Sequence, residues 1–368
     1  MYPLSAIRAP TRALRRNALP KSVISGMAQT VLGPVRPEDL GPTSTHEHLL
    51  IDYVCMHKHP SEASEQRFAR LPVTMEILGR IRYDPFSNLD NLMLDDENTA
   101  VAEALLFKRA GGKTIVDATT IGIGRDPRAL ARISRMAGIN VIMGAGYYVD
   151  MVHPRDMTAK SVDDLAKQLV VEVQEGVGDT GIKAGIIGEI GCSWPLTANE
   201  RKVVIAAAQA QQATGAPVLI HPGRNEYAPH EIVRILKESG ADVPRVIISH
   251  MDRTISSAKA LLELADMGCT VEYDLFGVEV SNYTLANFDM LNDAQRIGFI
   301  KLLVDKGHGT RVVTAHDIYS KHRLVKYGGH GYGYVLENMV PRMRKKGISD
   351  EAIEQIIVKT PARLLAFA

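Results

Sequence analysis

The sequence predicts a (β/α)8 barrel, which is a ring of parallel strands surrounded by helices. Short β-rich runs alternate strictly with longer amphipathic segments, and runs such as Val246-Ile247-Ile248 are apolar throughout. Continuous apolar strands are typical of a parallel sheet covered on both faces, and strict alternation is typical of βα units. The 368 residues can hold such a barrel, about 250 residues in its usual form, together with insertions.

Eight runs are predicted to be strands: residues 43–49, 114–120, 140–146, 184–190, 217–221, 245–250, 269–274 and 311–317. Helices are predicted over residues 97–110, 126–137, 162–177, 198–214, 229–239, 256–267, 293–306, 333–346 and 349–365. An open doubly wound sheet is the competing architecture, but no Gly-x-Gly-x-x-Gly follows the first strand. Residues 51–96 are predicted to be a long loop insertion after that strand.

Residues 1–26 differ in composition from the rest of the chain. They carry Arg8, Arg12, Arg15, Arg16 and Lys21 and contain no Asp or Glu. We interpret them as a disordered extension and residues 27–368 as the barrel domain. The expected location is therefore the cytoplasm, with a mitochondrial transit peptide as the alternative interpretation.

The overall composition narrows the classes of partner. A net charge of +1 gives no electrostatic case for nucleic acid or an anionic membrane, and no apolar run is long enough to span a bilayer. Three widely spaced cysteines form neither a disulfide framework nor a zinc pattern, and they suit a reducing compartment. We expect a small-molecule substrate and, by analogy with other barrels, a possible homodimer.

Metal-ligating side chains stand where five of the predicted strands end. Because chemistry in such barrels sits at the carboxyl ends of the strands, these side chains are expected to meet. A single histidine there is more often a hydrogen-bonded structural residue, but four imidazoles and two carboxylates suffice for two divalent ions. Zn²⁺ suits this donor set, with Mn²⁺ or Co²⁺ as alternatives. The predicted ligands are His46, His48, Glu189, His221, His250 and Asp317.

These residues, in this order, resemble the phosphotriesterase family of the amidohydrolase superfamily, and the resemblance extends from about residue 29 to residue 365. Longer strings resemble its phosphotriesterase-related subgroup, which is associated with hydrolysis of N-acetyltaurine. They are Thr45-His46-Glu47-His48-Leu49, Gly188-Glu189-Ile190-Gly191-Cys192-Ser193-Trp194-Pro195-Leu196, His221-Pro222-Gly223-Arg224-Asn225, and Lys321-His322-Arg323 followed by Lys326-Tyr327-Gly328-Gly329-His330-Gly331-Tyr332.

The resemblance implies how the ligands divide between two metals. His46, His48 and Asp317 would bind the buried metal, His221 and His250 the exposed one, and Glu189 both. The founding members bridge their metals with a carbamylated lysine at the end of the fourth strand. Gly188 stands at that place here, so Glu189 is expected to supply the bridging carboxylate without carbamylation.

The expected reaction is amide hydrolysis by a hydroxide that bridges the two metals. Two cations about 3.5–4 Å apart lower the pKa of a shared water. Asp317 and Glu189 are the predicted catalytic residues, with Asp317 carrying a proton to the leaving amine. A phosphotriesterase or a lactonase with the same site is the alternative, and a non-catalytic binding barrel is a more remote one.

A sulfonate tail on the substrate requires a cation or several N–H donors. The candidates for tail binding on the strand-end loops are Arg224, which we place first, and Arg253, Lys321, His322 and Arg323. Tyr147, Tyr148 and Tyr273 follow the third and seventh strands and are predicted to wall the pocket. His316, next to Asp317, is expected to face the helices on the opposite side of its strand.

Overall fold

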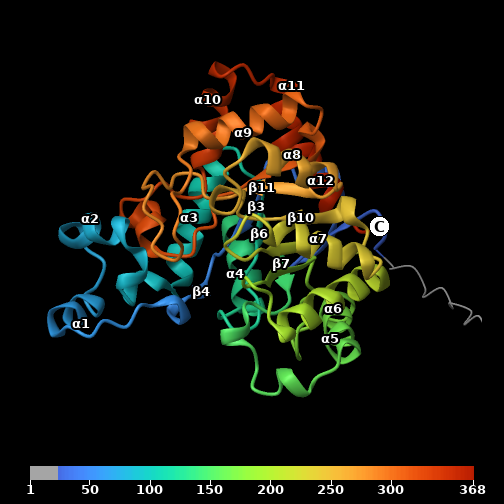
Figure 1. Ribbon diagram of the computed structural model, residues 1–368, viewed down its shortest axis with the longest axis horizontal. Helices are drawn as coiled ribbons and strands as arrows, with labels where there is room; N and C mark the ends of the chain where they lie inside the picture. The colour runs from blue at the N-terminus through green and yellow to red at the C-terminus, as the bar shows by residue number, and fades with distance from the viewer. Residues whose placement is uncertain (1–23) are drawn as a thin grey trace, which may run out of the picture.

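The computed structural model describes residues 24–368, and a parallel sheet of eight strands lies at its centre (Figure 1). Its strand order is β3-β6-β7-β8-β9-β10-β11-β12, and all the pairings along it are parallel. The strands are β3 (Thr43–Glu47), β6 (Thr114–Asp117), β7 (Asn140–Ala145), β8 (Ile186–Gly191), β9 (Val218–His221), β10 (Val246–Ile248), β11 (Thr270–Tyr273) and β12 (Val312–Thr314). Each lies within one of the eight predicted runs or extends it by a single residue.

The two edge strands of this sheet meet and close the barrel. The backbone N–H of Asp317 donates to the carbonyl of His46 at 3.0 Å, and the Thr45 hydroxyl donates to the carbonyl of Thr314 at 3.3 Å. The contact between first and last strand brings the carboxyl ends of β3 and β12 together. The predicted (β/α)8 barrel is thereby confirmed.

Helices follow the strands and surround the sheet (Figure 1). Several begin at a capping side chain, and Ser161, Thr197 and Asn292 each form a reciprocal capping box. The outer helices are α3 (Glu97–Arg109), α4 (Pro127–Ala137), α5 (Val162–Gln174), α6 (Ala198–Thr214), α7 (Ala228–Glu238), α8 (Ala258–Asp266) and α9 (Asp293–Asp305). The C-terminal segment holds α10 (Val340–Lys345), α11 (Asp350–Glu354) and α12 (Thr360–Leu365), with π-helical stretches at Val335–Met339 and Gln355–Lys359.

The insertion after β3 is folded rather than a plain loop. Helices α1 (Ala63–Ala69) and α2 (Met75–Tyr83) project to the left of the barrel in Figure 1. They share a small apolar cluster of Phe68, Val73, Leu78 and Ile81. Strands β4 (Ile51–Asp52) and β5 (Met93–Leu94) pair antiparallel where the insertion leaves and rejoins the barrel. The insertion therefore presents a structured wall to the strand ends.

The opposite end of the barrel is closed by apolar side chains, by residues 26–40 and by the C-terminal residues. Strands β1 (Ala28–Thr30) and β2 (Gly33–Val35) form a hairpin, and the Phe367 backbone bonds to Gly26 and Met27 at 2.8 and 2.9 Å. The apolar side chains are those of Ala28, Leu40, Val116, Ala118, Ile142, Ile186, Leu219, Ile247, Val313, Leu364 and Leu365. Most of the predicted extension, residues 1–23, lies outside the described residues. Within residues 24–368, no helix is long and apolar enough to cross a membrane.

Candidate metal centre

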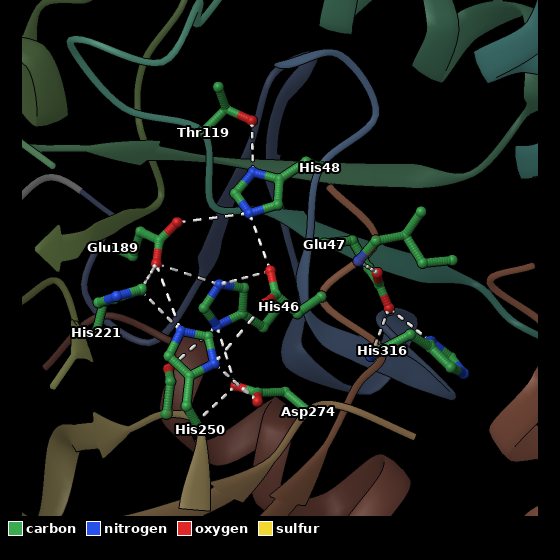
Figure 2. A network of polar contacts seen from close by, with 12 residues as sticks. His46, Glu47, His48, Thr119, Glu189, His221, His250, Asp274 and His316 are labelled. Carbon is green, nitrogen blue, oxygen red and sulfur yellow. Dashed lines mark hydrogen bonds and ion pairs between the residues drawn. The ribbon is translucent and has the colours of Figure 1, made fainter. Parts of the chain in front are cut away.

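The structure brings the six predicted ligand side chains together at the carboxyl ends of five strands. Figure 2 shows His46, His48, Glu189, His221 and His250 pointing toward one another. All six are buried; Asp317, the most accessible, is 7% exposed. His46 and His48 project to the same face of β3, as the alternation of an extended strand requires. Barrel closure then sets Asp317 beside them.

The first group of side chains comprises His46, His48 and Asp317, with Glu189 next to them. His48 Nε2 lies 3.2 Å from Asp317 Oδ1 and 3.4 Å from Glu189 Oε1, and His46 Nε2 lies 3.5 Å from Glu189 Oε2. Ligands bonded to Zn²⁺ at about 2.0–2.2 Å in a tetrahedron stand roughly 3.3–3.6 Å from one another. The spacing of these donor atoms is therefore that of a metal-binding group.

The hydrogen bonds of the outer ring nitrogens leave Nε2 free to bind a metal in both histidines. The Thr119 hydroxyl donates to the Leu50 carbonyl, so it accepts a proton from His48 Nδ1, 2.9 Å away. The Ser249 hydroxyl donates to Glu272, so it accepts from His46 Nδ1, 3.1 Å away. His46 Nε2 is buried and has no hydrogen-bond partner among residues 24–368. A buried nitrogen lone pair aimed at two carboxylates fits a cation.

The second group joins His221 and His250 to the same Glu189. Glu189 Oε2 lies 2.9 Å from His221 Nδ1 and 3.8 Å from His250 Nε2, while its Oε1 faces His48. Asp274 holds His250 by Nδ1 at 2.9 Å, which again turns Nε2 inward. The Glu189 carboxylate thus stands between the two groups, in the position that a bridging ligand requires.

His221 is hydrogen-bonded differently from the other three histidines. The Arg253 guanidinium, which can only donate, lies 3.0 Å from His221 Nε2, so the ring proton is on Nδ1. That proton points at Glu189 and at His250 Nε2, which is 2.8 Å away. Binding of a metal by His221 Nδ1 would require loss of this proton, because a metal ligand must be deprotonated at the binding atom.

Position 188 has no room for a side chain, which bears on the expectation that Glu189 supplies the bridging carboxylate. A Cβ atom at this position would lie 2.2 Å from the Leu219 carbonyl oxygen, and the Gly188 φ of 137° is one that side-chain-bearing residues rarely adopt. The peptide bond from Gly188 to Glu189 is cis. A lysine side chain has no room here, in agreement with the expectation that Glu189 supplies the carboxylate.

Two acidic residues at the end of β11, Glu272 and Asp274, were missed in the sequence. Both are fully buried beneath the histidines, and His46 Nδ1 lies 3.3 Å from each of them. Such carboxylates orient ligating imidazoles and raise their basicity. The sequence contained a signal for them, because Glu272 and Asp274 flank Tyr273 at a predicted strand end.

The electrostatic balance of the centre favours cations. Burial alone would raise the pKa of the Glu189 carboxyl, but His46, His221 and His250 hold it well below its ordinary value. Burial alone would lower the pKa of His46, but Glu189 and Asp274 raise it well above its ordinary value. The Glu189 carboxylate, which faces Nε2 of His46, therefore favours positive charge at that nitrogen, as a proton or as a metal ion.

A pocket opens over the metal-binding groups and contains several of the predicted substrate-binding residues. Its lining includes Arg224, Arg253, His322, His221 and Asp317. The tyrosines that line it, Tyr53, Tyr283 and Tyr319, were not predicted. Tyr148 lies beside it, with its hydroxyl 2.7 Å from that of Tyr53 and 3.5 Å from His221 Nε2.

Three residues that were predicted to line the pocket, Tyr147, Tyr273 and Lys321, point away from it. The Tyr147 hydroxyl donates to Gln168 on α5, and Tyr273 stacks on Phe299 of α9, so both face the helix layer. Lys321 pairs with Asp90 of the insertion at 2.6 Å. Each tyrosine lies next to a residue that does face the site, because adjacent residues of a strand point to opposite sides.

Comparisons with known proteins agree with this geometry. The sequence model of the phosphotriesterase family matches residues 26–365 of this chain. N-acetyltaurine hydrolase of Bos taurus is 47% identical over 348 residues, which cover 94% of this chain and 99% of that protein. The Homo sapiens N-acetyltaurine hydrolase has the same identity and coverage.

Two solved structures are similar over most of their length. A resiniferatoxin-binding protein from Rhodobacter sphaeroides is 38% identical with a TM-score of 0.90, covering 94% of this chain and 97% of its own. The phosphotriesterase homology protein from Escherichia coli, complexed with phosphate in its active site, is 27% identical with a TM-score of 0.71, covering 89% and 99%.

Proposed function

The chain belongs to the phosphotriesterase family, and we propose that it hydrolyses the amide bond of N-acetyltaurine or of a closely related small N-acyl amino-sulfonate. The products would be a carboxylic acid and an amino-sulfonate. The proposal extends to this chain the activity for which its relatives are named. We further propose that the six clustered ligands hold two divalent ions, with Zn²⁺ best suited to the donors.

The observation that carries the substrate class is the pair of arginines in the pocket. Among the described residues, neither Arg224 nor Arg253 forms an ion pair with a carboxylate. Arg224 donates to the Tyr283 hydroxyl at 2.7 Å, and Arg253 donates to the Pro222 carbonyl and to His221. Buried or partly buried guanidinium groups are normally paired, so these two favour a substrate that brings its own negative charge.

The two arginines without a carboxylate partner favour hydrolysis of an anionic amide over hydrolysis of a phosphotriester or a lactone. A phosphotriester or a lactone is neutral and would leave both guanidinium groups unpaired, whereas a sulfonate offers three acceptor oxygens. We place the tail at Arg224, because its guanidinium contacts the pocket residue Tyr283, whereas that of Arg253 is engaged by the predicted ligand His221. The scissile amide would then lie toward His221 and Asp317, which line the pocket on the side of the metal centre.

When bound, divalent ions supply Lewis acidity at the scissile carbonyl and lower the pKa of the attacking water. The chain's own residues hold the water and move its protons. Asp317 is the carboxylate that belongs to both the ligand cluster and the pocket lining, so it is placed to accept the proton of the water. It would pass that proton to the amide nitrogen as the C–N bond breaks, because an unprotonated amine leaves poorly.

The test is a hydrolysis panel on the metal-replete protein with four substrates: N-acetyltaurine, an N-acetyl amino acid, a lactone and an aryl phosphotriester. We expect N-acetyltaurine to have the largest kcat/KM and Glu189→Gln to abolish its turnover. Dominant turnover of the lactone or the phosphotriester would overturn the amidase assignment. Absence of both bound metal and hydrolysis would instead favour a non-catalytic binding barrel.

A further inference from the structure

The backbone at Asp317 has a left-handed conformation, which is uncommon for residues other than glycine. Its φ is 50°. Such a conformation persists only where the surrounding structure determines it. The groups that impose it therefore decide where the Asp317 carboxylate points.

One of these groups is Glu47, which lies between the predicted ligands His46 and His48 but faces the other side of β3. Figure 2 shows Glu47 turned away from the cluster and toward His316. Its carboxylate accepts the backbone N–H of His316 at 2.9 Å and that of Ile318 at 3.0 Å. These are the two residues that flank Asp317.

The His316 ring completes this contact. The backbone N–H of Val335 donates to His316 Nε2 at 3.0 Å, so the ring proton is on Nδ1. His316 Nδ1 then donates to Glu47 Oε1 at 2.6 Å, and the Ser44 hydroxyl donates to the same oxygen at 2.6 Å. Glu47 therefore receives four donors and offers none, which requires an ionised carboxylate.

Arg323 holds the same turn from its carbonyl side. Its guanidinium donates to the carbonyl of Asp317 at 2.6 Å and also to the carbonyl of His316. Gly329 packs directly on its backbone, since a Cβ atom there would lie 2.1 Å from the Arg323 carbonyl carbon. Arg323 is 2% exposed, these contacts occupy its two terminal nitrogens, and its Nε donates to His330 at 3.3 Å, which argues against the tail-binding role considered for it from the sequence.

We propose that Glu47 and Arg323 are positioning residues that clamp the turn at 316–318 and so aim the Asp317 carboxylate at the ligand cluster. The importance of that aim for turnover rests on the proposed role of Asp317 as ligand and proton carrier. Glu47 holds the two N–H groups on either side of Asp317, and Arg323 holds the carbonyls of His316 and Asp317. Neither side chain contacts substrate or metal in this scheme.

Glu47→Gln tests the clamp, with Glu103→Gln as its matched control. The variant amide keeps the size of the side chain but sets an NH₂ group against backbone or ring donors. Glu103 is also buried, and it accepts the N–H groups of Val325 and Lys326 at 3.0 and 2.8 Å, in the same segment but away from Asp317. Both variants should lower Tm.

Only Glu47→Gln should also act on the centre. We expect a fall of about 10- to 100-fold in kcat, the range for residues that orient metal ligands, with KM within about threefold of wild type. It should also retain less metal after dialysis, as measured by elemental analysis. Equal Tm losses with unchanged kcat and metal content in both variants would overturn the proposal.

Arg323→Lys provides a second test should Glu47→Gln fail to fold. Lysine keeps the charge but loses the fork that spans two carbonyls, so kcat and metal retention should fall while KM is unchanged. A raised KM with unchanged kcat and metal content would show that Arg323 binds substrate and would overturn the clamp. If wild type did not hydrolyse N-acetyltaurine, the proposed function would fail, while metal retention would still decide the clamp.

Discussion

The floor and the wall of the site carry opposite electrostatic surroundings, although both are largely buried. The floor is the ligand cluster with Glu272 and Asp274 beneath it, and the wall is the pocket side with Arg224, Arg253 and His322. Burial by itself lowers the pKa of a histidine in either place. On the floor, Glu189 nevertheless raises the pKa of His46 well above its ordinary value. On the wall, burial and Arg323 lower the pKa of His322 to about 3.

The two regions are buried to a similar extent, so the charged side chains around each of them, and not burial, decide which charge it accepts. The floor has carboxylates that attract cations, and the wall has guanidinium groups without carboxylate partners among the described residues. A substrate with a carbonyl at one end and a permanent anion at the other would match both halves.

Removal of the divalent ions from the ligand cluster should have the largest effect on turnover. Dialysis against a chelator should reduce N-acetyltaurine turnover to background, and adding Zn²⁺, Mn²⁺ or Co²⁺ should restore it in bicarbonate-free buffer. Bicarbonate should add nothing, because Glu189 is an encoded carboxylate and Gly188 leaves no room for a lysine. Recovery that required bicarbonate would contradict this account of the bridge. Rates before and after reconstitution, with metal content measured in parallel, provide the check.

Neutralising Asp317 should cause the next largest loss of turnover. Asp317→Asn keeps the shape of the side chain but cannot carry a proton, and kcat should fall by about 10²- to 10⁴-fold, the usual contribution of a general acid–base group. Asp179→Asn, on the surface beside Arg128, is the matched control and should leave kcat unchanged. An Asp317→Asn protein that retained both its metal and full turnover would exclude the proton-carrying role.

Removing the charge of Arg224 should weaken binding of the substrate anion at the pocket wall without changing the ligand cluster. A hydrogen bond to a charged group contributes about 1.5–3 kcal/mol, so Arg224→Met should lower kcat/KM for N-acetyltaurine by roughly 10- to 150-fold. Any residual turnover of a neutral lactone should change far less. Arg128→Met, at an exposed ion pair, serves as the control. Equal losses for the anionic and the neutral substrate would show that Arg224 does not select the tail.

Substitution of His322 at the pocket wall should have the smallest effect, a change in how stability depends on pH. Its folded pKa of about 3 lies below the unfolded value of about 6.5, so unfolded chains bind the extra proton between these values. The stability that the neutral ring contributes is therefore complete above pH 6.5 and declines as pH falls toward 3. His322→Asn should remove this part of the acid sensitivity, at most about 1.4 kcal/mol per pH unit. Urea unfolding of chelator-treated protein at pH 7 and pH 5 measures it, and identical pH slopes for both proteins would contradict the prediction.

The barrel and the six clustered residues could be predicted because both follow from short-range patterns. Alternation of apolar strands and amphipathic helices specifies βα units, and closure of eight such units brings every strand end to one rim. The relation of His46 to His48 needs only the two-residue period of a strand. Glu189, His221 and Asp317 could be placed at that rim without knowledge of any contact.

What the sequence alone could not decide was the direction of individual side chains beyond the strand ends. Tyr148 faces the site and Tyr147 the helices, and one residue of register separates the two outcomes. Lys321 is withdrawn by Asp90, which an insertion distant in sequence carries to it. Composition and period determine which elements form and where they end, because those depend on neighbours along the chain. The pairing of Glu47 with the turn at Asp317 depends on contacts that exist only once the first and last strands have met.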